Sequence, residues 1–206
     1  MRFFTSTLTI LLFTIAIPIS VLGQHAVWAS EVLEFSSEQR LSHHFHHLHP
    51  QAYKALQVLD EPNIMPGSKG TMHAWTPAKP NQIDFIKVKF AEYINVRQIV
   101  IAKAINPSAI TEIYLYDTTG LQYLVNTFEP TAVPLNGRLF HIFIEKTPFK
   151  VTALKVVLDG SKVPGYNGLD AIGISESEIV AYFNHTQITL DDAFAILDNR
   201  NGQELA

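Results

Sequence analysis

The chain has 206 residues, of which 47% are hydrophobic, 17% charged and 11% aromatic. This composition is typical of a globular protein and excludes a disordered tail or a fibrous repeat. Fifteen Lys and Arg residues stand against nineteen Asp and Glu residues, which gives a formal net charge of −4, and there is no long basic run. We therefore expect no nucleic acid among its partners.

The N-terminus has the pattern of a secretory signal peptide. Met1 and Arg2 precede an uncharged run, rich in Leu, Ile and Phe, that reaches Gly23. Small residues offer two cleavage positions, after Ala29 as the first choice and after Gly23 as the second. The alternative is an uncleaved anchor, because the run is long enough to cross a bilayer. Both alternatives put the folded part outside the cytoplasm, in the periplasm, secreted or at the cell surface, and cleavage leaves no membrane span.

The sequence contains no cysteine, so an exported domain of this kind has no disulfide bonds. Without disulfides the domain depends on its hydrophobic core, which is typical of a bacterial envelope protein. We divide the chain into a signal peptide at 1–29, one main domain at 30–175 and a C-terminal extension at 176–206.

Short apolar or alternating runs, separated by Gly, Pro, Asn and Asp, predict strands along the main domain. Alternation with a period of two residues indicates strands with one buried face, whereas the run at Val96–Ala104, rich in β-branched residues, indicates a strand covered on both faces. Thr118-Thr119-Gly120 predicts a hairpin. Together they predict an all-β fold, an antiparallel β-sandwich. The expected strands are Glu31–Phe35, Asp84–Phe90, Val96–Ala104, Ile110–Asp117, Leu121–Phe128, Leu139–Glu145, Thr152–Asp159 and Leu169–Ile174.

Two further segments have helical spacing. Gln51–Val58 is long enough for one or two turns with Ala52, Ala55 and Leu56 facing inward. Residues 189–199 carry Thr189 as N-cap and two Asp residues in the first turn, where negative charge suits the helix dipole. We expect this short C-terminal helix to pack on the sandwich through its apolar residues Leu190, Phe194 and Leu197.

Motifs of the common enzyme classes are missing from the sequence. There is no Cys nucleophile and no G-x-S-x-G, H-E-x-x-H or G-x-G-x-x-G motif. Gly160 to Gly165 has the spacing of a P-loop, but Tyr166 and Asn167 stand where Lys and Ser or Thr would hold phosphate and magnesium. We therefore expect a binding protein and no catalytic residues.

Several segments, in this order, resemble the galactose-binding-like family, also called discoidin or coagulation factor type C domains. They are Leu59-Asp60-Glu61-Pro62-Asn63, Ala74-Trp75, Phe85-Ile86-Lys87-Val88, Val96-Arg97-Gln98-Ile99-Val100-Ile101 and the closing run Val163 to Ile172. The resemblance covers Glu31 to Ser175 and implies a jelly-roll sandwich that binds glycans, lipids or proteins without catalysis. The flanking cysteines of animal members are absent, and the loop between Asn63 and Trp75 is longer than usual.

The resemblance brings together two segments that carry oxygen ligands for a structural calcium ion. Asp60, Asn63 and Asp170 are the candidate ligands, with backbone carbonyls completing the shell. The alternative is that Asp60 and Asn63 are turn residues whose side chains bond to their own backbone.

The same loops carry the candidate ligand-binding residues for a sugar. Tyr166 and Trp75 offer flat aromatic faces, and Asn167 and His73 offer directional hydrogen bonds. For Trp75 the alternative is a place in the core, where the family packs the corresponding Trp. Tyr166, in a loop rich in Gly and Pro, is therefore the better candidate.

Five of the nine histidines lie between His43 and His49. On a helix, His43 would share a face with His46 or His47 and could bind zinc, copper or nickel. The alternative is a solvated loop that binds metal only adventitiously.

The sequence thus predicts an extracytoplasmic binding module for a carbohydrate or another cell-surface ligand. The alternative is a structural or protein-interaction module whose partner is an envelope protein.

Overall fold

The computed structural model describes residues 26–41, 47, 49–64, 72–133 and 137–181. The predicted helix at 189–199, the run up to Gly23, His43 and His46 lie outside the described residues. Each of the eight predicted strands overlaps an observed one. The elements are β1 (Val27–Phe35), η1 (Ala55–Val58), β2 (Ile83–Ile94), β3 (Gln98–Ile105), η2 (Pro107–Ala109), β4 (Ile110–Tyr116), β5 (Gln122–Thr127), β6 (Arg138–Phe143), β7 (Val151–Asp159) and β8 (Gly168–Ser175).

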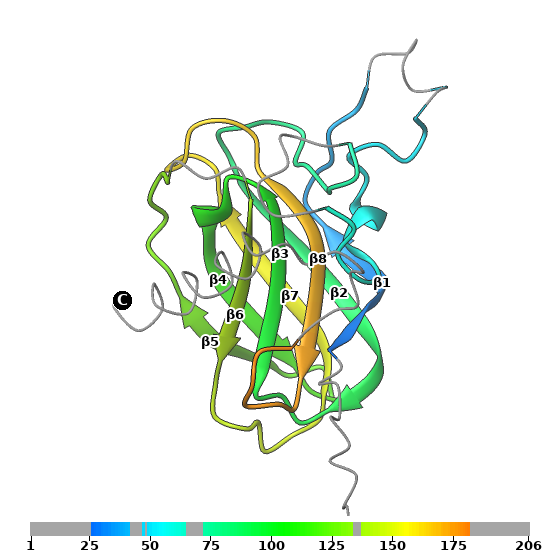
Figure 1. Ribbon diagram of the computed structural model, residues 1–206, viewed down its shortest axis with the longest axis vertical. Helices are drawn as coiled ribbons and strands as arrows, with labels where there is room; N and C mark the ends of the chain where they lie inside the picture. Colours follow the sequence, from blue (N-terminus) through cyan, green and yellow to red (C-terminus); the bar gives the residue numbers. More distant parts are fainter. Residues whose placement is uncertain (1–25, 42–46, 48, 65–71, 134–136, 182–206) are drawn as a thin grey trace, which may run out of the picture.

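The strands form one antiparallel sheet in the order β5-β4-β7-β2-β1-β8-β3-β6. This sheet is curled into two layers, so that β6, β3 and β8 lie in front of β4, β7 and β2 (Figure 1). β1 belongs to both layers, because Val27 and Trp28 pair with β8 whereas Ala29 to Phe35 pair with β2. The predicted hairpin is confirmed by the pairing of β4 with β5.

The main core lies between the two layers, where the apolar residues of each alternating strand face inward. Ile86, Val88 and Phe90 of β2 are fully buried against residues of the opposite layer such as Ile99 and Ile101 of β3. Removing these side chains from water is the principal favourable contribution to folding. The two predictions of a core and of an all-β fold are therefore confirmed.

A second apolar cluster lies on the outer face of the front layer. Val100 and Ala102 alternate with the inward residues of β3, and both are nearly inaccessible to solvent. The prediction that this strand is covered on both faces is thereby confirmed. The cluster also contains Ala26, Leu139, Ala171 and Ala181, with Trp28 packed against it.

The segment predicted as one or two helical turns forms the 3₁₀ helix η1 instead. Ala52 and Ala55 are buried as expected, but Leu56 is 56% exposed and Val58 is fully buried. The reason is the period of the 3₁₀ helix, which aligns residues three apart and so turns Ala55 and Val58 to the same side. Among the described residues, no helix has the length and apolarity that crossing a membrane requires.

Candidate functional site

The two loop regions predicted to carry the site meet at one end of the sandwich. The backbone N–H of Trp75 donates to the carbonyl oxygen of Leu169 at 2.8 Å, and the N–H of Leu169 donates back at 2.9 Å. This exchange is an isolated bridge that places Trp75 beside the start of β8. It holds the segment around His73 next to the segment that begins with Asp170.

The prediction that Trp75 binds the ligand is wrong. Its side chain is 0% exposed, and its indole Nε1 donates to the carbonyl oxygen of Ser37 at 2.9 Å. A large aromatic side chain packs in the core when its single polar group finds a partner there. A ring without exposed surface cannot stack on a sugar, so Trp75 anchors the loop and does not bind.

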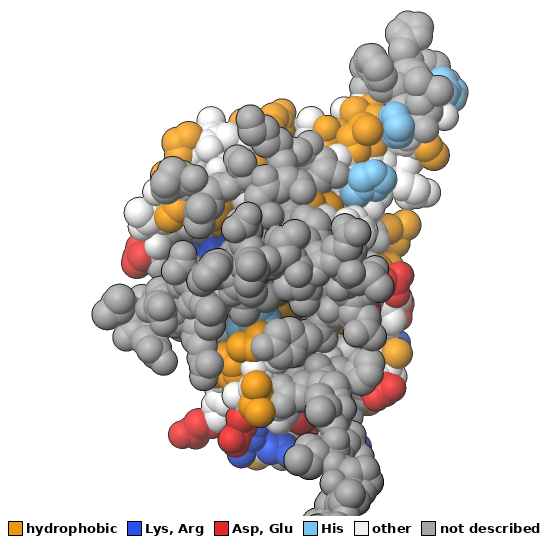
Figure 2. All heavy atoms as spheres, viewed as in Figure 1, with side chains coloured by type: hydrophobic (Ala, Val, Ile, Leu, Met, Phe, Trp, Pro, Cys, Tyr) orange, Lys and Arg blue, Asp and Glu red, His pale blue; other side chains and the backbone are white. Residues whose placement is uncertain are grey.

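His73 is exposed and lines a pocket of about 220 Å³ on the surface of this loop end. Its other lining residues come from the segment before and within η1 and from the residue that precedes His73. They are His49, Pro50, Gln51, Ala52, Gln57 and Met72. Figure 2 shows histidine side chains gathered over this part of the molecule, at the upper right.

Backbone hydrogen bonds hold the two walls of this pocket together. The N–H of Tyr53 donates to the carbonyl oxygen of Met72 at 2.9 Å, and the N–H of Thr76 donates to that of Tyr53 at 3.2 Å. Tyr53 has a φ of 61°, in the left-handed region, where a non-glycine residue turns the chain sharply. The side chain of Gln57 donates to the carbonyl oxygen of Gln51 at 2.7 Å, which fixes the pocket's inner wall.

The lining of the pocket mixes polar and apolar groups and includes no Asp, Glu, Lys or Arg among its described residues. Imidazole and amide groups donate and accept hydrogen bonds, whereas the side chains of Pro50, Ala52 and Met72 give apolar contact. The volume is below the roughly 300–1,000 Å³ typical of pockets for drug-sized molecules. The pocket therefore suits a ligand smaller than a drug-sized molecule, held by hydrogen bonds and apolar contact.

Tyr166 and Asn167 lie in the loop before β8 and are not among the residues that line this pocket. Tyr166 is 40% exposed, and its backbone carbonyl accepts a hydrogen bond from the Asn106 side chain at 2.7 Å. Asn167 is 4% exposed, which keeps it out of reach of a ligand at the surface. The buried position of Asn167 does not support the prediction that it binds a ligand at the surface. Tyr166 is exposed, and its role in binding a sugar stays a prediction.

The candidate calcium ligands occupy different environments. Asp170 is buried, and its carboxylate accepts the backbone N–H groups of Asn63 at 3.1 Å and of Ile64 at 3.0 Å. Asp60 and Asn63 are exposed, and Asp60 has a φ of 66°, typical of a turn residue. The carboxylate of Asp170 therefore fastens the loop directly, and the calcium site stays a prediction.

The histidine-rich segment is described only at His47 and His49, both of which are exposed. Within the described ranges, no group of three or more His, Cys, Asp or Glu side chains could hold a metal ion. The zinc site at His43, His46 and His47 stays a prediction. Sequence reasoning missed His49, Gln57 and Met72, because the backbone pairing of Tyr53 with Met72 leaves no pattern in the sequence.

No protein-family model and no curated protein matches this chain. Solved structures do match. The family 32 carbohydrate-binding module of Streptococcus pneumoniae EndoD has a TM-score of 0.52 at 9% identity, covering 74% of this chain and 100% of that one. Chitosan-binding module 1 from the chitosanase/glucanase of Paenibacillus sp. IK-5 has a TM-score of 0.50 at 15% identity, covering 73% and 98%.

The fold is of the galactose-binding-like type. The expectation from the resemblance is thereby confirmed for the fold. A structure of XRCC1 bound to the DNA polymerase beta catalytic domain matches equally well, with a TM-score of 0.51 at 14% identity over 74% of this chain and 99% of that one. Identities this low show the fold alone, because one fold carries many functions.

Burial lowers the pKa of two side chains in this galactose-binding-like sandwich, Lys103 and His141. Burial lowers the pKa of Lys103 from 10.5 to about 7, and its Nζ finds no hydrogen-bond partner in the described part. Burial also lowers the pKa of His141 from 6.5 to about 4. The Nδ1 of His141 lies 3.4 Å from Oε1 of Gln98. Both groups favour their neutral forms because a low-dielectric interior penalises charge.

Proposed function

We propose that this protein is a non-catalytic carbohydrate-binding module that works outside the cytoplasm. The observation that carries the proposal is the pocket of about 220 Å³ beside His73, at the loop end of a fold that it shares with two modules named for carbohydrate or chitosan binding. Polar groups that converge in a concave site are the usual arrangement for small-molecule recognition.

The lining favours one neutral sugar unit. His73, His49 and Gln57 supply directional hydrogen bonds to hydroxyl groups, and Met72 and Pro50 contact the apolar face of the ring. Because the described lining carries no charged side chain, recognition would not depend on an acidic or amino group of the sugar.

The test is a glycan array probed with the full exported chain, followed by calorimetric titration of each glycan retained. His73→Ala should abolish retention, because the imidazole lines the pocket. His47→Ala is the matched control, since His47 is also an exposed histidine but is not among the pocket's lining residues. Equal affinity of the His73→Ala variant and the unmodified chain would refute this site.

Tyr166 offers a second position for the sugar at the same end. Tyr166→Ala should lower affinity if the loop before β8 takes part, and Tyr93→Ala serves as the control. Tyr166 and Tyr93 are each 40% exposed, but Tyr93 lies near the end of β2, at the other end of the sandwich. Loss in both Tyr variants would indicate a general effect on the fold.

The alternative function, an interaction module for an envelope protein, is favoured by β5. This strand ends the strand order of the sheet, and Leu121 and Leu124 beside and within it are 58% and 54% exposed. An exposed edge strand with apolar side chains is a template for pairing with another chain. Leu124→Lys should then abolish capture of the partner and leave glycan retention unchanged.

A further inference from the structure

The outer face of the front layer carries an apolar cluster that is closed to solvent, beside the buried polar side chains of Gln98 and His141. We define it by Val100 and Ala102 of β3, Leu139 of β6 and Ala171 of β8, which are 0%, 6%, 2% and 0% exposed. Their register places them on one face, because Ala102 pairs with both Leu139 and Ala171. The described side chains that join them in one cluster are Ala26, Ala181 and Trp28, and two of these are small.

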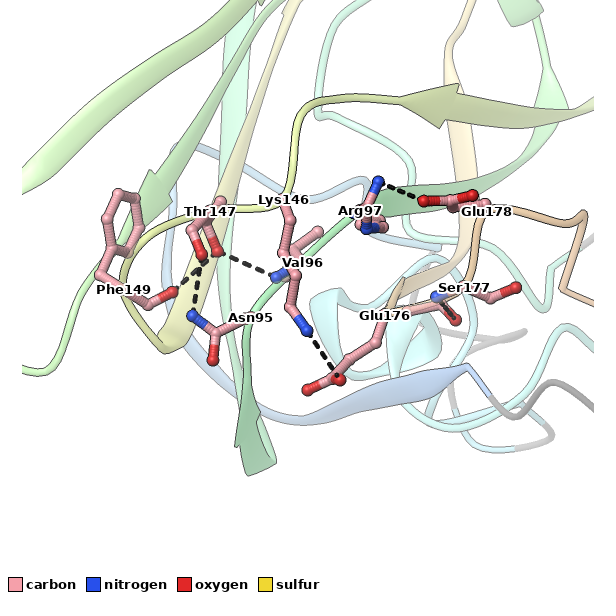
Figure 3. Close-up of polar contacts among 10 residues, drawn as sticks. Asn95, Val96, Arg97, Lys146, Thr147, Phe149, Glu176, Ser177 and Glu178 are labelled. Carbon is pink, nitrogen blue, oxygen red and sulfur yellow. Dashed lines mark hydrogen bonds and ion pairs between the residues drawn. The ribbon is translucent and has the colours of Figure 1, made fainter.

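The chain returns toward this outer face directly after β8. Figure 3 shows the turn that makes the return, with Glu176 and Glu178 pointing at cations of neighbouring loops. Nζ of Lys146 lies 3.4 Å from Glu176, and Nη1 of Arg97 lies 2.5 Å from Glu178. The N–H of Ile179 donates to the Ser177 hydroxyl at 2.9 Å, which closes the turn.

Gln98 then fixes the end of the described chain on the outer face. Its Nε2 donates to the carbonyl oxygen of Ile179 at 3.0 Å, and its Oε1 accepts the N–H of Ala181 at 2.9 Å. Gln98 is fully buried, Val180 is 7% exposed and Ala181 is 2% exposed. The described chain therefore ends, at Ala181, beside the apolar cluster of the outer face.

The sequence that follows has the chemistry to cover this face. Leu190, Phe194 and Leu197 are spaced by four and three residues, as on one side of a helix. A helix over residues 189–199 would span about 16 Å. The eight residues of β3 span about 26 Å, so such a helix fits within the length of the sheet.

We propose that residues 182–206 pack on the outer face of β8, β3 and β6 in the same molecule. Leu190, Phe194 and Leu197 would face Val100, Ala102 and Leu139. Attachment through Ala181 favours this intramolecular contact over a second copy, because a short link gives a high effective concentration. The proposal is independent of glycan binding, and it assigns the outer face to the protein itself.

The absence of cysteine makes cross-linking a direct test in the full chain. Ala102→Cys is combined in turn with Leu190→Cys, Phe194→Cys and Leu197→Cys, and each pair is oxidised and analysed by non-reducing electrophoresis and intact mass. We expect an intramolecular disulfide in at least one pair. The matched control replaces Ala102→Cys with Lys155→Cys on β7. The side chain of Lys155 lies on the outer face of the back layer, so this variant should give no intramolecular disulfide.

Two outcomes of the cross-linking would overturn the proposal. If disulfides form only between molecules, a second copy covers the face. If the Lys155→Cys pairs give as much intramolecular disulfide as the Ala102→Cys pairs, the contact is unspecific. A second measurement does not rely on disulfide geometry. Phe194→Asp should abolish the hydrogen-exchange protection of amides in β6 and raise binding of an apolar dye, whereas Asn199→Asp should change neither. Unchanged protection in Phe194→Asp also contradicts the proposal.

Discussion

The indole ring of Trp28 lies directly against Gly173 on the neighbouring strand. A Cβ atom at Gly173 would stand 2.7 Å from Cε3 of the ring, closer than real Cβ contacts allow. The two residues are register partners in the two-residue stretch where β1 pairs with β8. This contact therefore helps to join the two layers of the sheet.

Gly173→Ala should destabilise the protein by about 1–3 kcal/mol, the usual cost of overpacking a buried site. The measurement is urea unfolding. Trp28→Leu in the Gly173→Ala background should recover part of the loss, because the smaller side chain leaves room for the methyl group. If the two single changes simply add, the ring and the glycine are not coupled.

The position of β1 bears on the two predicted cleavage sites. Cleavage after Ala29 would remove Val27 and Trp28, and with them the pairing of β1 with β8. Cleavage after Gly23 would leave β1 whole. We therefore predict that the exported protein starts at Gln24, which N-terminal sequencing of the secreted chain checks. A mature N-terminus at Ser30 would contradict this and would predict a less stable domain.

Lys103 should lower stability at neutral pH. In the unfolded chain its pKa is near 10.5, and in the fold it is about 7, so between these values the unfolded state holds more protons and stability rises with pH. Lys103→Met should stabilise the protein by about 2–5 kcal/mol at pH 7 and by less near pH 10. The measurement is chemical unfolding at both pH values, with the exposed Lys150→Met as control. An equal gain at both values would point to packing instead of charge.

His141 should make the fold sensitive to acid. Its pKa is about 4 in the fold and near 6.5 when unfolded, so the unfolded state holds more protons in this window. Stability contributed by the neutral form is present above pH 6.5 and falls by up to about 3 kcal/mol as the pH drops to 4. His141→Gln should flatten this slope, whereas His73→Gln, at an exposed position, should retain it. The measurement is the melting temperature of the unmodified chain and of both variants between pH 4 and 7; an unchanged slope in His141→Gln would contradict the prediction.

Asp170 should stabilise its loop whether or not calcium binds. Removing the carboxylate in Asp170→Ala leaves the N–H groups of Asn63 and Ile64 without their acceptor and should cost about 2–4 kcal/mol. The calcium prediction is tested by the same variant in a chelator. If calcium binds, the chelator lowers the melting temperature of the unmodified chain only; if it has no effect on either protein, the site holds no calcium.

The strands could be predicted from sequence because inward and outward residues alternate, as in Ile86, Val88 and Phe90. The burial of both faces of β3 could also be predicted, since Ile99 to Ala102 is an unbroken apolar run within Val96 to Ala104. These features depend on neighbours in the sequence, which a period of two residues reveals directly.

The pocket could be predicted only at His73. Its other wall depends on a backbone hydrogen bond between Tyr53 and Met72, and backbone groups are the same in every residue. Trp75 was proposed as a ligand face because a large aromatic residue suits both a core and a sugar platform. The full burial of its ring and the bond from its indole to the Ser37 carbonyl separate the two roles.

The pairing of Val27 with Ile174 has a consequence for the order of folding. Val27 and Trp28 find their partners only when β8 is available, so β1 cannot join the two layers while the chain is still incomplete. Contacts this distant in sequence slow folding, because a long loop must be ordered before they form.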